Sequence, residues 1–192
     1  MSPFFETIKI EDKKIQNLKY HNLRLNKTIK EIYNKKSDIN LLDFINKLNT
    51  KPTRCKVIYD KEIKSITYEP YKKRVFNSFK IINSNIKYPY KSTNRDEIEK
   101  LFKQKDFCDD ILITENKLLK DTSIANIAFY DGLRWLTPKE PLLCGTIRAK
   151  LLDEKKIIQR DIRVKDIKNM VSFAIMNSLI GFLEIKNSKF KY

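Results

Sequence analysis

The residues best suited to chemistry in this chain lie in two short stretches, residues 121–129 and 145–148. The first begins with a carboxylate, continues through small side chains to Asn126 and ends in an apolar strand. Small side chains in succession let another molecule approach the backbone closely. The second begins a predicted helix with Gly-Thr-Ile, and N–H groups with a hydroxyl at a helix N-terminus favour phosphate. A tight hairpin beside an ordinary helix cap would look the same, so each stretch alone leaves both interpretations open.

A lysine and a carboxylate extend this pattern. Lys91 lies just after a polar connector over residues 83–89. An amine shielded from water at a lobe junction loses its proton more easily and becomes nucleophilic, as Schiff-base chemistry requires. Asp121 could hold a proton on a heteroaromatic nitrogen and keep that ring electron-poor, or it could only cap the turn before Thr122. The chemical interpretation therefore depends on both residues occurring with the predicted anion site.

Further positions could serve the same anion. Arg24 follows His21 by three residues, and a guanidinium binds phosphate through two parallel hydrogen bonds. A solvated helix arginine is the plainer alternative, and His21 is assigned to packing or capping. Asn177 and Ser178 interrupt an apolar segment, where they either donate hydrogen bonds to an anion or form a bulge or turn.

The composition indicates a basic protein of one compact unit or two small lobes. The 192 residues include 40 Lys and Arg against 24 Asp and Glu, a formal net charge of +16. This charge raises nucleic acid as a partner. The lysines are spread among Asn and Ile, however, and no nucleic-acid-binding motif is visible. We therefore prefer a solvated lysine surface that attracts acidic substrates, and keep a non-enzymatic nucleic-acid-binding module as the alternative.

Cysteine usage and hydropathy predict a cytoplasmic protein. Cys55, Cys108 and Cys144 are far apart in apolar contexts, which is typical of reduced thiols. A single histidine excludes multi-histidine metal centres, and we expect no metal. The N-terminus lacks the pattern of a signal peptide. The apolar stretch over residues 171–185 is too short and too polar to span a membrane.

Hydrophobic periodicity predicts an α+β fold in two lobes. The N-terminal lobe, residues 1–86, is expected to hold two helices against an antiparallel sheet, with helices at residues 22–34 and from a cap at 37–38 onward, and strands at residues 4–10, 53–59, 63–68 and 74–83. The larger C-terminal lobe, residues 87–192, is expected to contain helices at residues 94–104 and 146–152 and strands at residues 111–114, 118–120, 126–130, 133–136, 157–162 and 171–185.

Taken together, these segments resemble the class IV aminotransferase family, the fold-type IV pyridoxal phosphate enzymes. Each matching segment is weak alone, but six occur in the family's order over nearly the whole chain. They are Phe5-Glu6-Thr7, His21-x-x-Arg24-Leu25, Lys91-Ser92-Thr93-Asn94-Arg95, the run from Asp121 to Ile127, Leu143-Cys144-Gly145-Thr146-Ile147-Arg148, and Phe173 to Leu179.

The resemblance implies a two-lobe fold like that of D-amino acid aminotransferase, with pyridoxal 5'-phosphate between the lobes, in a homodimer. It makes Lys91 the catalytic residue, which binds the cofactor as a Schiff base, and pairs Asp121 with the pyridine nitrogen. It assigns the phosphate to Arg24, Thr146 and the backbone of Ile147. The remaining cofactor-binding positions that it implies are Gly145, Asn126, Asn177 and Ser178.

The lysine segment and residues 173–179 are most similar to those of 4-amino-4-deoxychorismate lyases. That likeness implies release of pyruvate and 4-aminobenzoate, a folate precursor, from a small anionic substrate, without nucleic acid or membrane as a partner. A class IV aminotransferase acting on branched-chain or D-amino acids, or a cofactor-binding member without turnover, is the alternative. Two features depart from the family: Asp121 replaces the usual glutamate, and the chain begins almost directly at the Phe-Glu-Thr motif.

Overall fold

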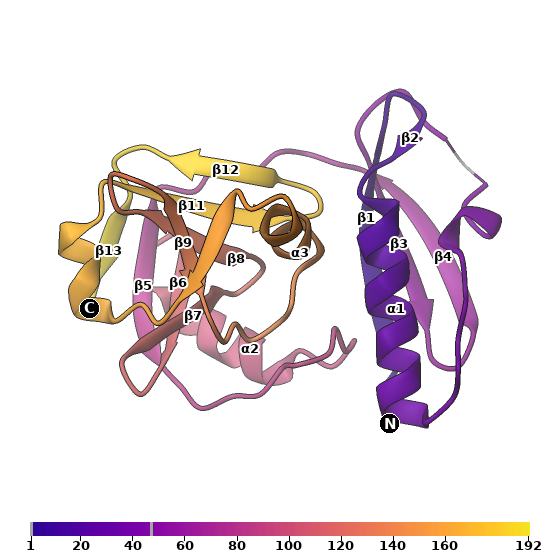
Figure 1. The fold of residues 1–192 in the computed structure, drawn as a ribbon, viewed down its shortest axis with the longest axis horizontal. Helices are drawn as coiled ribbons and strands as arrows, with labels where there is room; N and C mark the ends of the chain where they lie inside the picture. The colour runs from indigo at the N-terminus through magenta and orange to yellow at the C-terminus, as the bar shows by residue number, and fades with distance from the viewer. Residues whose placement is uncertain (1, 47) are drawn as a thin grey trace. The chain divides into compact units, whose positions relative to one another are not determined.

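The structure is a computed structural model that describes residues 2–46 and 48–192. These residues form two compact units (Figure 1). The first contains the described residues up to Lys73 together with Tyr90–Asn94, and the second contains Arg74–Pro89 and Arg95–Tyr192. Each unit combines strands with helices, so the predicted α+β class is confirmed.

The division between the units differs from the predicted boundary between residues 86 and 87. β5 (Ser78–Asn83) belongs to the second unit because it pairs in parallel with β6 (Asp110–Glu115) and with β13 (Lys189–Lys191). Tyr90–Asn94 belongs to the first unit because its backbone pairs with the start of β1 (Phe4–Glu11). Strand pairing over long sequence separations thus decides a boundary that local composition does not reveal.

The first unit is an antiparallel sheet with a helix against it. Its strand order is β2-β1-β3-β4, where β2 is Lys14–Ile15, β3 is Thr53–Tyr59 and β4 is Ile63–Pro70. α1 (Leu18–Tyr33) begins four residues earlier than predicted. Leu25 and Ile29 of α1 pack in one buried cluster with Ile8 and Ile10 of β1. This spacing of apolar residues is that of a helix with one buried stripe.

The predicted second helix of the first unit is wrong, because the described residues there form only a 3-10 turn, η1 (Leu41–Asp43). Asn26 of α1 accepts a hydrogen bond from Ile39 N at 2.9 Å and donates to Ile39 O at 2.8 Å. Asn22 accepts from Leu41 N at 3.0 Å. These two side chains hold the segment before η1 against α1, and Asn26 occupies Ile39 O, a carbonyl that would accept an intrahelical hydrogen bond in the predicted helix.

The second unit is built on a mixed sheet with the strand order β10-β9-β8-β7-β6-β5-β13, and β11 pairs with both β8 and β12. The remaining strands are β7 (Leu118–Thr122), β8 (Asn126–Tyr130), β9 (Trp135–Pro138), β10 (Ile157–Arg160), β11 (Ser172–Asn177) and β12 (Gly181–Ile185). The helices are α2 (Asp96–Phe102) and α3 (Thr146–Asp153), with 3-10 turns η2 (Lys103–Lys105) and η3 (Val164–Asn169). The short strand β13 was not predicted.

β8 separates two packed layers of the second unit. Ile127 and Phe129 face the larger core, whereas Ala128 belongs to a smaller cluster that Ile147 and Leu151 of α3 cover. Successive side chains of a strand point to opposite faces. Asn126, which alternates with Ile127, is therefore on the side of α3.

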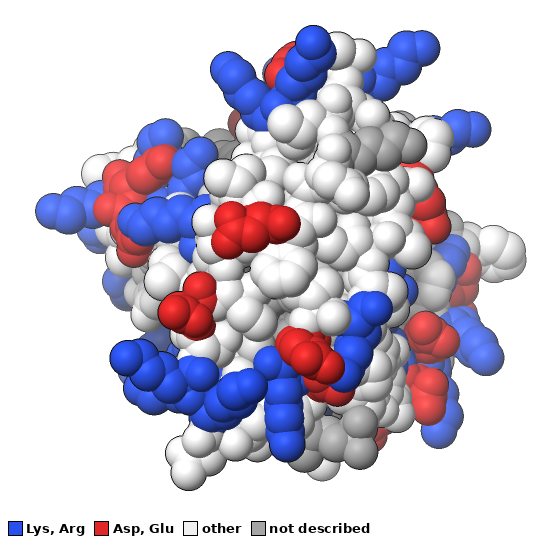
Figure 2. Space-filling model, turned by 90° about the vertical axis from the view of Figure 1, so that its right-hand side faces the viewer, with Lys and Arg blue, Asp and Glu red and all other residues white. Residues whose placement is uncertain are grey.

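Charged side chains are dispersed over the face shown in Figure 2. Lysines and arginines on this face lie around a largely uncharged centre and are interspersed with acidic residues. This is the distribution that solvated lysines would give. Within the described residues, no helix has the length and apolar character needed to cross a membrane.

Candidate active site

An irregularity in β7 determines where Asp121 points. Leu119 pairs with Thr114, but Thr122 pairs with Leu112, so three steps along β7 lie opposite two along β6. The extra residue makes a β-bulge, a feature that redirects the side chains beside it. Leu119 packs into the larger core, and Asp121, two residues later, points to the side of α3 instead.

The Asp121 carboxylate is buried and held by two hydrogen bonds. Asn126 Nδ2 donates to Oδ1 at 2.8 Å, and Leu143 N donates to Oδ2 at 3.0 Å. Burial raises the pKa of Asp121 from 3.8 to about 7, although these hydrogen bonds and the charge of Arg148 oppose the rise. A carboxyl in such surroundings favours either a proton of its own or a cation placed against it.

The N-terminus of α3 is brought close to this carboxylate through Asn126. A Cβ atom on Gly145 would lie 2.0 Å from Asn126 Oδ1, so only glycine permits this approach. Gly145 occupies the N-cap position of α3, and its lack of a side chain leaves the first turn without a side-chain cap. Thr146 is buried at this end. Backbone donors and a hydroxyl at a helix N-terminus form the kind of site that binds phosphate.

Arg148 has a structural part in the same motif. It is buried, and Nη2 donates to Pro138 O at 2.8 Å while Nε donates to Thr137 Oγ1 at 3.4 Å. These bonds tie α3 to β9. The sequence pattern identified the segment but did not reveal that its arginine points into the protein.

The backbone of the small-residue run after Asp121 is fixed from three directions. Arg95 Nη2 donates to Ser123 O at 2.8 Å, and Asp110 Oδ1 accepts from Ser123 N at 3.4 Å. Asn177 Nδ2 donates to Ile124 O at 3.2 Å. The run is therefore pre-organised by side chains from distant parts of the second unit.

Asn177 has the turn role that the sequence left open. Its Oδ1 accepts hydrogen bonds from Leu179 N at 3.0 Å and Ile180 N at 2.9 Å, which closes the turn between β11 and β12. Ser178 is in that turn. The link from Asn177 to Ile124 places this turn beside the small-residue run.

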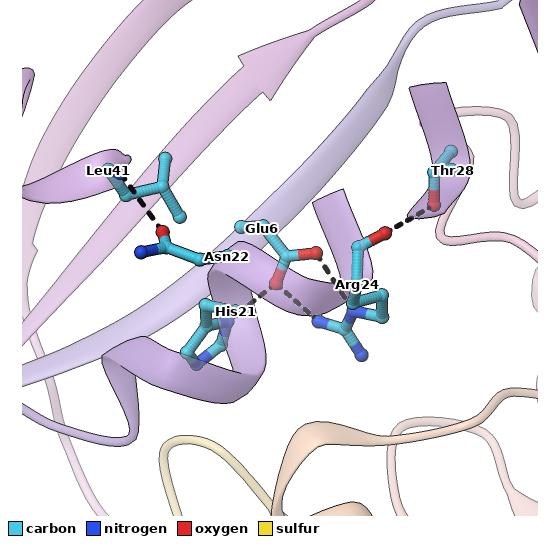
Figure 3. A network of polar contacts seen from close by, with 6 residues as sticks. All are labelled: Glu6, His21, Asn22, Arg24, Thr28 and Leu41. Atoms are coloured by element: carbon cyan, nitrogen blue, oxygen red, sulfur yellow. Dashed lines mark hydrogen bonds and ion pairs between the residues drawn. The ribbon is translucent and has the colours of Figure 1, made fainter. Parts of the chain in front are cut away.

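In the first unit, a carboxylate that the sequence analysis did not assign joins His21 and Arg24 (Figure 3). Arg24 Nε donates to Glu6 Oε1 at 2.8 Å and Nη2 to Oε2 at 2.5 Å, and His21 Nδ1 is 2.5 Å from Oε2. Burial by itself raises the pKa of Glu6, but the charge of Arg24 and the hydrogen bonds from His21 and Arg24 lower it to about 2. Burial lowers the pKa of His21. His21 is therefore neutral, and its Nδ1–H donates a hydrogen bond to the ionised carboxylate of Glu6.

Glu6 carried a signal in the sequence that could have identified it. Phe4, Glu6, Ile8 and Ile10 occupy alternate positions of β1, and all four are buried. A carboxylate in the apolar register of a strand needs a cation or donors beside it. Here Arg24 and His21, three residues apart on α1, supply them.

Lys91 is held beside this network within the first unit. Phe5 N donates to Lys91 O at 2.9 Å, and Thr93 N donates to Pro3 O at 2.8 Å. Lys91 Nζ lies 4.6 Å from the centroid of the Phe5 ring, and its charge helps to lower the pKa of His21. The first unit thus gathers Lys91, His21 and Arg24, while the second gathers Asp121, Asn126, Gly145, Thr146, Ile147, Asn177 and Ser178.

This fold and these sites define a class of protein: the chain belongs to the amino-transferase class IV family, whose model matches residues 3–188. An uncharacterized protein of Haemophilus influenzae strain Rd is 37% identical over 187 residues, which are 94% of this chain and 100% of that protein. The family resemblance seen in the sequence is therefore confirmed.

Solved structures of related proteins share the architecture. The crystal structure of a protein named as a putative 4-amino-4-deoxychorismate lyase from Haemophilus somnus 129PT is 33% identical, with a TM-score of 0.88 over 94% of this chain and 98% of that one. A hypothetical aminotransferase from Mycobacterium tuberculosis, in a form bound to pyridoxal phosphate, is 12% identical with a TM-score of 0.80, over 98% of this chain and 81% of that one. The second likeness shows the fold alone.

Proposed function

We propose that this protein is a pyridoxal phosphate-dependent 4-amino-4-deoxychorismate lyase. The observation that carries the cofactor assignment is the buried carboxyl of Asp121, whose raised pKa makes a protonated ring nitrogen a favourable partner. The similarity to the Haemophilus somnus protein over nearly its full length supports the lyase reaction. The lysine segment with its lyase-like Asn94-Arg95 agrees with this choice.

The residue types present in each unit suit the groups of the cofactor. Lys91 Nζ would bind its aldehyde carbon, and Asp121 would accept a hydrogen bond from its ring nitrogen. The phosphate would be held by Arg24 and by the N-terminus of α3 at Thr146 and Ile147. Asn126 and Gly145 shape the site around Asp121, and Ser178 in the turn closed by Asn177 is a further donor. Aspartate in place of glutamate is one methylene shorter but keeps the charged pair.

Lys91 would move the proton in this reaction, and Glu6 would support Arg24. When bound, the cofactor withdraws electrons from the α-carbon of the substrate, which makes loss of a proton there possible. Lys91 Nζ accepts that proton, and the face of the Phe5 ring stabilises the resulting ammonium. Glu6 keeps Arg24 oriented through two hydrogen bonds and balances its charge. Cleavage of the substrate's C–O bond would then release the three-carbon side chain, which takes up the proton from Lys91 to become pyruvate, and would leave 4-aminobenzoate. Aromatisation of the substrate ring drives this step.

A pair of lysine variants tests the cofactor assignment. The purified protein should absorb in the visible region, lose that colour on borohydride reduction and gain a mass adduct on the peptide containing Lys91. Lys91→Ala should abolish both effects. The control Lys87→Ala removes a lysine whose side chain is 73% exposed and should change neither. Colour and adduct that persist in Lys91→Ala would remove the basis of the proposal.

The reaction itself is tested by offering two kinds of substrate to the same preparation. With aminodeoxychorismate, we expect 4-aminobenzoate and pyruvate in equal amounts. With branched-chain or D-amino acids and 2-oxoglutarate, we expect no sustained amino transfer. Keto-acid formation without 4-aminobenzoate would favour the aminotransferase, and binding of the cofactor with neither product would indicate a member without turnover.

A further inference from the structure

We infer that Asn126 is a positioning residue that fixes the spacing between the ring-nitrogen partner, Asp121, and the phosphate-binding end of α3. The inference rests on the proposed function, because it requires one cofactor held at both points. It also changes the role expected for Asn126, from contact with the cofactor to control of the two groups that make that contact.

The hydrogen bonds of Asn126 are directed at the protein. Its Nδ2 donates to Asp121 Oδ1 at 2.8 Å and to Leu143 O at 2.7 Å. A primary amide has two N–H donors, so both are used. Asn126 as a whole is 4% exposed. No donor of Asn126 is left for a ligand, and its contribution must pass through the residues it binds.

These bonds close a ring. Leu143 N donates to Asp121 Oδ2 at 3.0 Å, so the Asp121 carboxylate, the Asn126 amide and the backbone N–H and C=O of Leu143 are linked by three hydrogen bonds. A closed arrangement of this kind fixes the position of each member. The bond from Asn126 also stabilises the ionised carboxylate, because it is among the contacts that oppose the rise in the pKa of Asp121.

The oxygen of the same amide sets the approach of α3. A Cβ on Gly145 would be 2.0 Å from Asn126 Oδ1, so the glycine backbone lies against this side chain. Asn126 thus contacts both anchoring segments of the proposed site. The pyridine ring and the phosphate belong to one small molecule, so their protein partners must be spaced to match it. Serine would be too short for this role, and aspartate would oppose Asp121 with a second carboxylate.

The role predicts a specific loss. When two anchors have the correct spacing, binding at one makes binding at the other effectively intramolecular, and the joined ligand gains over its parts. Disturbing the spacing should therefore weaken pyridoxal phosphate more than pyridoxal, which lacks the phosphate. A merely structural defect would weaken both ligands alike.

The experiment compares Asn126→Ser and Asn126→Asp with the wild type, after any bound cofactor has been removed with hydroxylamine. Absorbance titrations give Kd for pyridoxal phosphate and for pyridoxal, and urea unfolding reports stability. We expect pyridoxal phosphate to bind about 10- to 100-fold more weakly to both variants, the range for loss of a hydrogen bond to a charged group. The Kd for pyridoxal divided by the Kd for pyridoxal phosphate should fall by a similar factor. The control Asn169→Ser, at an exposed position of η3, should leave the ratio unchanged.

A second comparison tests the contact with Gly145. Gly145→Ala should weaken pyridoxal phosphate in the wild-type background, because the new methyl group meets Asn126. In the Asn126→Ser background the same change should cost much less, since the obstructing oxygen is gone. Equal losses in both backgrounds would contradict the proposed contact. This comparison remains decisive if Asn126→Asp does not unfold cooperatively.

The outcomes separate the two proposals. Failure of the wild type to bind pyridoxal phosphate would refute the proposed function. Tight binding by the wild type, together with an unchanged Kd ratio in a folded Asn126→Ser variant, would refute the positioning role alone.

Discussion

Replacement of Asp121 by asparagine should change how the stability of the cofactor-free protein depends on pH. Asp121 is buried, and its pKa is raised from 3.8 to about 7, so the folded protein holds this proton more tightly than the unfolded chain. Its contribution to stability is therefore full below about pH 4 and is lost as the pH rises to about 7. The variant has no proton to lose at this position.

The size of the effect follows from the pKa shift. Between pH 5 and about 7 this carboxyl is ionised in the unfolded chain but protonated in the folded protein. The free energy of unfolding therefore falls by about 1.4 kcal/mol for each pH unit. The wild type should therefore lose roughly 2 to 3 kcal/mol between pH 5 and pH 8 that the variant keeps. The variant turns an amide hydrogen toward Asn126 or Leu143, both of which donate to Asp121. That penalty, about 1 to 3 kcal/mol, is the same at both pH values and cancels in the comparison.

Urea unfolding at pH 5 and pH 8 measures the difference directly. His21, with a lowered pKa, and Asp110, with a pKa raised by burial, also titrate, but they are the same in both proteins. The difference between the two pH profiles therefore isolates Asp121. Asp161→Asn, at an exposed position, is the matched control and should leave the profile of the wild type unchanged. Parallel profiles for the wild type and Asp121→Asn would refute the account of the buried carboxyl.

Three further predictions concern other side chains. Glu6→Gln should reduce the free energy of unfolding by about 3 to 5 kcal/mol, because Arg24 keeps its charge and loses its partner. The exposed control Glu62→Gln should cost less than about 1 kcal/mol in the same urea titration, and equal costs would contradict this assignment. Arg148→Met should cost about 2 to 3 kcal/mol, since Pro138 O and Thr137 Oγ1 lose a charged donor; a loss below 0.5 kcal/mol would show that α3 needs no such anchor. With Ellman's reagent, exposed Cys144 should react in the native protein, whereas buried Cys55 and Cys108 should react only on unfolding. Burial also raises the pKa of Cys55 to about 12. Pyridoxal phosphate should slow the reaction of Cys144, and an unchanged rate would contradict a phosphate site at the adjacent Gly145.

The placement of α3 and β8 could be predicted from sequence because local patterns are sufficient there. Gly145 before a helical pattern predicted the start of α3, and an apolar run after the small residues predicted β8. The order of six short motifs identified the family, which the match over residues 3–188 confirms. These features depend on neighbouring residues and on spacing along the chain.

Other features depended on contacts between distant residues. Ile39, Leu42 and Ile45 have helical spacing, but Asn22 and Asn26 of α1 form hydrogen bonds with the backbone of Leu41 and Ile39, and the described residues there form only a 3-10 turn. β5 follows the first sheet in sequence but pairs with β6 and β13. Local propensity could not predict either result, because the competing partners are far away in the chain.

The candidate site also combines features set by local sequence with features set by contacts between distant residues. The sequence alone determined that Asp121 precedes a run of small residues and that Gly145 precedes a helix. A strict strand alternation would have placed Asp121 on the same side as Leu119, in the larger core. The β-bulge in β7 places it on the side of Asn126 instead, and the side chain of Asn126 links it to the segment before α3. Only the tertiary structure decided this arrangement, because a bulge and a buried amide are set by pairing between strands.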